Sequence, residues 1–172
     1  MLIADFEALR SWRGAIHESG DYERACDALG NATLTELQVG DHRIVVWDIG
    51  GPGTACIVRV SPAHISIVRI WPDASWTEAD CERTLISAAT ERFGSEQLAQ
   101  LSIHSGYLLA LWAPEDVSAG GLPLGDSGSP DNLSIGDGGA YVHVPLGCYS
   151  VTACEWQTDI YDVTKIDLRL LS

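Results

Sequence analysis

Residues 33–76 read TLTELQVGDHRIVVWDIGGPGTACIVRVSPAHISIVRIWPDASW, and this stretch decides the fold. It contains four short apolar runs, which are Thr33–Val39, Arg43–Ile49, Thr54–Val60 and Ile65–Trp71. Turn residues separate the runs at Gly40-Asp41, Gly50-Gly51-Pro52-Gly53 and Ser61-Pro62. Because glycine, aspartate and proline supply the backbone angles of tight reversals, the stretch predicts a four-stranded meander.

One long helix is predicted directly after the meander, over Thr77–Phe93. Thr77 and Asp80 have the spacing of a capping box, and Gly94 provides a stop. An apolar stripe at helical spacing lies between them, formed by Cys81, Leu85, Ala88, Ala89 and Phe93. Before the meander, two short helices are predicted over Asp5–Trp12, with Asp5 as its N-cap, and over Asp21–Leu29.

The C-terminal half predicts further strands on either side of a long loop. Leu98–His104 and Tyr107–Trp112 predict a hairpin, and three more strands are predicted over Ala140–Val144, Tyr149–Trp156 and Val163–Leu170. In the last strand Ile166, Leu168 and Leu170 alternate with Lys165, Asp167 and Arg169, which predicts one buried face. Residues 113–139 are dominated by Gly, Ser, Pro and Asp and predict a long acidic loop.

The whole pattern is typical of an α+β protein. It predicts a mostly antiparallel β-sheet, made of the N-terminal meander plus the C-terminal strands, with one long helix at about 77–93 and short N-terminal helices. A length of 172 residues fits a single domain. Two subdomains, 1–94 and 95–172, are an alternative, and one sheet or two stays open at this point.

The charge is strongly acidic, with 24 Asp and Glu against 10 Lys and Arg and a formal net charge of -14. Such a surface repels phosphate backbones, so neither nucleic acid nor an anionic membrane is an expected partner. A basic protein would instead be attracted. The alternative is that the acidic residues serve only to keep a protein with 6 Trp in solution.

The cysteines and the N-terminal residues favour a reducing compartment. The five cysteines include no Cys-x-x-Cys pair, and the first residues, Met1 to Glu7, lack the basic and apolar regions of a signal peptide. No apolar run approaches the length that spans a membrane. A cytoplasmic location is therefore predicted.

No motif indicates catalysis or a cofactor. Gly50–Gly53 lacks the Lys-Ser/Thr of a phosphate-binding loop, and the five histidines show neither His-x-His nor His-Glu-x-x-His spacing. No Gly-x-Ser-x-Gly elbow is present, and the aspartates of the long loop do not match a calcium-loop pattern. The sequence predicts no catalytic residue, no metal ligand and no cofactor, and therefore a protein that is not an enzyme.

Two of the tryptophans are candidates for contact with a partner. Trp47, Trp71 and Trp112 lie in or beside apolar strands and are predicted to be core residues. Trp76 and Trp156 lie next to polar residues at the ends of elements and are predicted to be partly exposed. Tryptophan is enriched at interface hot spots, although packing over a sheet edge is the more common role.

Several segments resemble the immunity protein 21 family of bacterial polymorphic toxin systems. The resembling residues are Trp12-Arg13-Gly14, Asp21-Tyr22-Glu23-Arg24-Ala25-Cys26-Asp27, the strand pair around Val39-Gly40, and the closing Pro145-Leu146-Gly147-Cys148-Tyr149-Ser150-Val151. The resemblance implies a small cytoplasmic protein that binds and blocks the toxin domain encoded beside it. It implies no catalytic residues.

The expected function is thus neutralisation of a basic, nuclease-type toxin domain by acidic surface complementarity. The residues expected to contact it are Trp76, Glu115, Asp116, Asp126, Asp131, Asp137 and Trp156. The alternative is a small-molecule or peptide-binding module without catalysis, which would use a pocket lined by the sheet.

Overall fold

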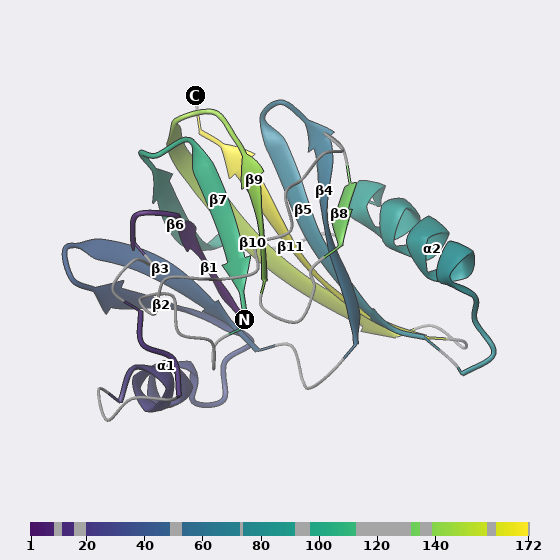
Figure 1. Cartoon of the computed structure of the whole chain (residues 1–172), viewed down its shortest axis with the longest axis horizontal. Helices are drawn as coiled ribbons and strands as arrows, with labels where there is room; N and C mark the ends of the chain where they lie inside the picture. The colour runs from purple at the N-terminus through teal and green to yellow at the C-terminus, as the bar shows by residue number, and fades with distance from the viewer. Residues whose placement is uncertain are drawn as a thin grey trace.

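The computed structural model describes residues 1–8, 12–15, 20–48, 53–72, 74–91, 97–112, 132–134, 139–157 and 161–171. These residues form two antiparallel β-sheets packed face to face, with one helix against the outer face of one sheet and the other helix across one end of the second sheet (Figure 1). The α+β class with mostly antiparallel sheets is therefore confirmed.

We call the two sheets sheet A and sheet B. Sheet A has five strands in the order β2-β3-β1-β7-β9, with bounds β1 (Leu2–Asp5), β2 (Leu34–Val39), β3 (His42–Trp47), β7 (Tyr107–Leu111) and β9 (Gly139–His143). Sheet B has six strands in the order β6-β10-β11-β5-β4-β8, with bounds β4 (Thr54–Ser61), β5 (His64–Trp71), β6 (Gln97–Ile103), β8 (Asn132–Ser134), β10 (Gly147–Gln157) and β11 (Asp162–Leu170). The helices are α1 (Asp21–Leu29) and α2 (Glu78–Thr90).

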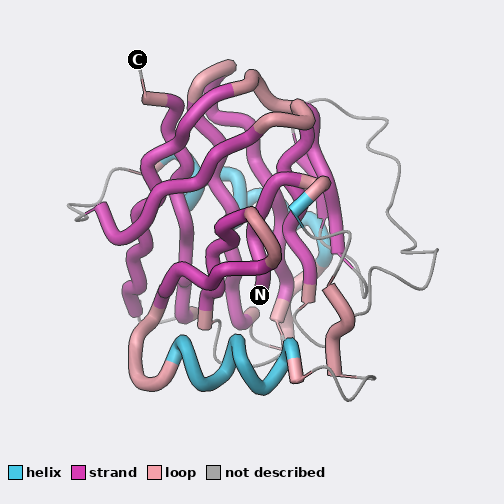
Figure 2. The backbone as a smooth tube through the Cα atoms, turned by 90° about the vertical axis from the view of Figure 1, so that its left-hand side faces the viewer, coloured by secondary structure: helices cyan, strands magenta, loops and turns pink. Residues whose placement is uncertain are grey.

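Apolar side chains fill three layers. The largest cluster lies between the sheets, where Ile3 and Val45 of sheet A meet Ile67 and Ile166 of sheet B. A second cluster lies on the outer face of sheet A around Trp12 and includes Ala25 of α1, which runs across one end of the strands in Figure 2. The third lies between the outer face of sheet B and Leu85, Ala88 and Ala89 of α2. Both sheets are thus covered on both faces.

The predicted four-stranded meander is wrong as a single sheet. Strands β2 and β3 form a hairpin in sheet A, whereas β4 and β5 form a hairpin in sheet B. Alternation shows which faces of a strand are apolar, but it does not show which neighbour the strand pairs with. Placing the two hairpins in opposite sheets allows their inner faces to cover each other.

The predicted hairpin over residues 98–112 is also divided between the sheets. β6 pairs with β10 in sheet B, and β7 pairs with β1 and β9 in sheet A. Strands β9 and β10 likewise belong to different sheets, while β10 and β11 pair over their whole length. Each sheet therefore takes strands from both sides of residue 94, the boundary considered between subdomains.

The helix predicted over Asp5–Trp12 does not begin at Asp5: Phe6 and Glu7 form a turn, Ala8 is in a 3-10 turn, and residues 9–11 lie outside the described residues. Leu2–Asp5 is strand β1, in the middle of sheet A, with Leu2, Ile3 and Ala4 fully buried. Consecutive apolar residues fit a strand that is covered on both faces. Asp5 ends β1, and its side chain accepts a hydrogen bond from Glu7 N in the turn that follows. The second short helix is α1, as the sequence predicts.

Helix α2 begins at the predicted capping box. The Thr77 side chain accepts a hydrogen bond from Asp80 N, and the Asp80 carboxylate accepts one from Thr77 N. The helix ends at Thr90, and residues 92–93 of the predicted span and the predicted stop at residue 94 lie outside the described residues. Lys165 of β11 is only 1% exposed, and its Nζ donates to the carbonyls of Ala88, Ala89 and Glu91. On the predicted polar face of β11, Lys165 and Asp167 are therefore buried, whereas Arg169 is exposed.

Side chains also tie the two sheets together at their edges. Glu36 of β2 accepts a hydrogen bond from Gln100 N of β6 at 2.9 Å, and Arg59 of β4 donates to His143 O of β9. These bonds occupy polar groups that edge strands would otherwise expose. Neither described helix is long and apolar enough to cross a membrane.

Candidate functional site

The inner face of sheet B changes from apolar to polar toward one end. One row across the strands consists of Ala153, Ile166, Ile67 and Ile57. Two residues further along each strand, and hence on the same face, the row is Glu155, Thr164, Arg69 and Ala55. The next row contains Gln157, Asp162 and Trp71. The inter-sheet core therefore ends in ionisable and polar side chains.

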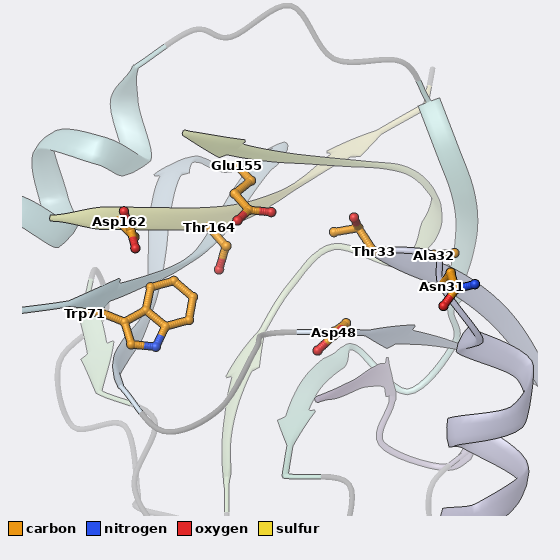
Figure 3. Close-up of a pocket in the computed structure, with 8 residues that line it drawn as sticks. All are labelled: Asn31, Ala32, Thr33, Asp48, Trp71, Glu155, Asp162 and Thr164. Atoms are coloured by element: carbon orange, nitrogen blue, oxygen red, sulfur yellow. The ribbon is translucent and has the colours of Figure 1, made fainter. Parts of the chain in front are cut away.

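A cavity of about 460 Å³ lies at these polar rows (Figure 3). Sheet B lines it with Trp71, Glu155, Asp162 and Thr164. The opposite side is lined by Asn31, Ala32 and Thr33, in the turn after α1, and by Asp48 at the end of β3. Asp48 N donates to Thr33 O at 2.8 Å, which holds this turn against the end of β3. We call this space the inter-sheet cavity.

Arg69 lies buried beside the inter-sheet cavity. Its guanidinium carbon is 4.1 Å from the centroid of the Trp71 ring, and the side chain is 0% exposed. Among the described residues, none of its three side-chain nitrogens has a hydrogen-bond partner. Burial lowers the pKa of Arg69 to about 10, against the opposing effect of the Asp48 carboxylate. Arg69 is still a cation at neutral pH, and it fixes one face of the Trp71 indole.

Thr164 presents a buried hydroxyl group to the same cavity. The residue is 3% exposed, and its Oγ1 has no hydrogen-bond partner in the described part of the chain. A buried polar group without a partner costs about 1–3 kcal/mol, so such groups are uncommon in folded proteins. The hydroxyl is therefore available to a bound molecule.

The charges at the inter-sheet cavity are unbalanced. Its lining contains three carboxylates, from Asp48, Glu155 and Asp162, and the Arg69 guanidinium and the Met1 amino group lie within electrostatic range of Asp48. Asp48 and Glu155 are exposed and Asp162 is half-buried, so the carboxylates can be reached from solvent. No group of three or more His, Cys, Asp or Glu side chains among the described residues is placed to hold a metal ion. The lining favours a cationic organic group.

Two smaller cavities lack these features. One, of about 280 Å³, lies between α2 and β4 and is lined by Thr54, Cys56, Glu78, Cys81, Glu82, Leu85 and Ile86. The other, of about 250 Å³, is lined by Ala8, Asp41, His42, Arg43, Gln100, Ser102 and His104. Neither lining includes a buried side-chain polar atom left without a partner within the described residues.

The two tryptophans predicted to contact a partner lie away from the inter-sheet cavity. Trp76 and Trp156 are half-buried and pack against the apolar cluster between α2 and sheet B, with the Trp76 ring 5.1 Å from that of Tyr161. The structure thus brings the two tryptophans to one cluster, but on the face of sheet B opposite the inter-sheet cavity. The predicted acidic contacts lie outside the described residues; they are Glu115, Asp116, Asp126, Asp131 and Asp137.

Sequence reasoning missed the residues of the inter-sheet cavity. One signal was present, because Arg69 occupies an inner-face position between Ile67 and Trp71 in an otherwise apolar strand. A cation in such a position marks the end of an apolar core or a buried polar site. Asp48, Glu155 and Asp162 gave no comparable signal, since acidic residues are common throughout the chain.

Comparison with protein-family models, with curated proteins and with solved structures gave no match for this chain. The class of protein is therefore inferred from the fold, the charge and the geometry of the site.

Proposed function

We propose that this chain is an immunity protein, a non-enzymatic bacterial protein that acts in the cytoplasm and neutralises a cognate toxin domain. The observation that carries the proposal is the accessible group of carboxylates around the inter-sheet cavity in a chain of net charge -14. An acidic surface with a partly apolar centre suits a basic partner, because charge steers the encounter and desolvated contacts hold the complex.

The partner proposed is a nuclease-type toxin domain. A nuclease groove must carry clustered Lys and Arg to bind phosphate groups, so an acidic protein can occupy it in competition with nucleic acid. The resemblance to the immunity protein 21 family supports the same class. Its most specific residues lie in the α1 layer, where Asp21 accepts hydrogen bonds from Arg13 N and Arg24 Nη1. These residues therefore stabilise the fold, and the partner contact is assigned to other residues.

Co-expression tests the proposed function. The toxin domain encoded next to this gene is expressed from an inducible promoter, with this protein or with an empty vector, and colony-forming units are counted. Protection by this protein, but not by the empty vector, is the expected result. Equal killing in both strains, with both proteins present at normal levels, would overturn the proposal.

A binding module for a small molecule or peptide is the second candidate. The inter-sheet cavity favours it, because an indole, an unpartnered hydroxyl and several carboxylates line one space of about 460 Å³. Native mass spectrometry of protein purified without denaturant distinguishes the two candidates. A stoichiometric bound molecule, together with no protection in co-expression, would favour the binding module.

A further inference from the structure

We infer that the inter-sheet cavity is the binding site for an arginine side chain of the partner protein. The identity of the partner rests on the proposed function, whereas the chemistry of the site rests on the cavity itself. The site is defined by Asp48, Trp71, Glu155, Asp162 and Thr164.

The carboxylates of the inter-sheet cavity suit a ligand that donates hydrogen bonds. Ionised carboxylates only accept hydrogen bonds, and the hydroxyl group of Thr164 can accept as well as donate. Three carboxylates outnumber the one nearby guanidinium, that of Arg69, so a positive ligand reduces the imbalance. An anion would meet the carboxylates first, because Arg69 is 0% exposed and its guanidinium packs over the Trp71 ring.

Thr164 supplies the observation that is independent of the acidic cluster. Its hydroxyl is buried, lines the inter-sheet cavity and has no partner among the described residues. Figure 3 shows Glu155 and Thr164 on one side of the space and Asp48 on the other. A ligand placed between them would complete the hydrogen bonding of Thr164 and contact carboxylates from both sheets.

This arrangement favours arginine over lysine. The guanidinium group is flat and directs five N–H donors in fixed directions, so it can reach acceptors on two walls at once. A lysine ammonium presents its three donors from a single point. The cavity opens to solvent at Asp48 and Glu155, which are both exposed, so a side chain from another protein can enter there.

Arg69 acts as a positioning residue for this site. Its guanidinium covers one face of Trp71 at 4.1 Å and thereby fixes the indole as a wall of the inter-sheet cavity. Gly53 permits this packing, because a Cβ atom there would lie 2.9 Å from Arg69 Nε and 2.7 Å from Ile70 O. The buried cation is therefore part of the wall and does not compete for the ligand.

An NMR titration of the isolated full-length protein tests the site. The probes are N-acetyl-arginine amide, its neutral isostere N-acetyl-citrulline amide, and N-acetyl-lysine amide. We expect saturable shifts with the arginine probe at a dissociation constant on the order of 1–10 mM, at least tenfold weaker binding of citrulline, and intermediate binding of lysine. Equal binding of the arginine and citrulline probes, or no saturable shift with arginine, would overturn the inference.

Two variants locate the binding. Thr164→Val removes the unpartnered hydroxyl, so the midpoint of thermal unfolding should stay unchanged or rise. The affinity for the arginine probe should fall several-fold. Glu155→Gln, at an exposed position, should lower the affinity for the arginine probe about tenfold. Asp27→Asn, on the exposed side of α1, is the matched control and should bind like the wild type. Equal affinity of all three variants would place the probe outside the cavity and overturn the inference.

The inference and the proposed function can fail separately. If the arginine probe binds the cavity but the wild-type protein gives no protection in co-expression, the proposed function is wrong and the site stands. If the wild type protects, but the probe does not bind and Glu155→Gln/Thr164→Val protects equally well, the inference is wrong and the proposed function stands.

Discussion

At the scale of single residues, buried charge is the main feature of this protein. Lys165 is the one lysine of the chain, and it lies buried between sheet B and the C-terminal end of α2. Its Nζ is 3.2 Å from Asp167 Oδ2 and donates to carbonyls at the end of α2. Carbonyl groups at a helix C-terminus lack intrahelical partners and favour a cation. No basic residue lies in the last turn of α2 itself, so β11 supplies the charge.

Lys165→Met should lower the free energy of unfolding by about 3 kcal/mol, because it removes the cation from the buried helix carbonyls and from Asp167, which keeps its hydrogen bond with the His64 ring at 2.9 Å. Chemical denaturation followed by tryptophan fluorescence measures the change. Arg83→Met is the matched control, since Arg83 is 75% exposed and pairs with Asp80 on the surface of α2. The free energy of unfolding of this control should fall by no more than about 0.5 kcal/mol. Equal losses in the two variants would contradict the assigned role of Lys165.

The sequence could not predict the role of Lys165. The alternation of Lys165, Asp167 and Arg169 with apolar residues is typical of a solvent-facing strand side. The partners of Lys165 are backbone carbonyls of a helix more than seventy residues away, and a sequence pattern does not show them. Thr164 was equally inconspicuous, because a threonine in a strand has no unusual meaning until its surroundings are known.

At the scale of elements, the distinctive feature is that the chain changes sheet five times, between β3 and β4, between β6 and β7, and at each step from β7 through β8 and β9 to β10. Asp5 fixes the second of these connections to the end of β1. Its Oδ2 accepts hydrogen bonds from His104 N and Ser105 N, and its Oδ1 accepts one from Glu7 N. Burial raises the pKa of Asp5, but these backbone hydrogen bonds outweigh it, so the pKa lies below its ordinary value.

Asp5→Asn should lower the free energy of unfolding by about 1–3 kcal/mol at neutral pH, because an amide NH2 group would replace one acceptor. Since the folded pKa is depressed, the contribution of Asp5 is fully present above pH ~4 and is lost as the pH falls through the folded pKa. The difference in the free energy of unfolding between the wild type and the variant should therefore become smaller in acid. Urea denaturation at pH 7, 5 and 3 measures it.

Asp27→Asn serves as the control for Asp5→Asn, because Asp27 is exposed on α1. Its effect should stay within about 0.5 kcal/mol at each pH. The difference in the free energy of unfolding between the wild type and Asp5→Asn could instead stay constant from neutral pH into acid. That result would show that the charge of Asp5 does not stabilise the connection between β6 and β7.

Most elements could be predicted from the sequence, but their pairing could not. The capping box at Thr77 and Asp80 located the start of α2, and alternation located β11 to within one residue. Short turns such as Ser105-Gly106 look alike whether the next strand pairs with the previous one or crosses to the facing sheet. Which sheet a strand joins depends on how several inner faces pack together, which no single segment determines.

At the scale of the whole molecule, the two sheets enclose an apolar core, and the inter-sheet cavity lies at one end of it. The net charge of -14 is a property of the sequence, and it predicted a basic partner. The position of the carboxylates around the cavity arises only when β3, β5, β10 and β11 are brought together in two facing sheets. The cavity could therefore not be predicted from the sequence, whereas the sign of its charge could.

Binding of the purified protein to the toxin domain encoded beside it tests the central claim most directly. The dissociation constant is measured by calorimetry for the wild type, for Glu155→Gln/Thr164→Val at the cavity, and for Trp76→Ala and Asp27→Asn away from it. We expect the cavity variant to bind at least tenfold more weakly and Asp27→Asn to bind like the wild type. Wild-type affinity of the cavity variant, with a loss in Trp76→Ala, would contradict the account and place the interface on the outer face of sheet B.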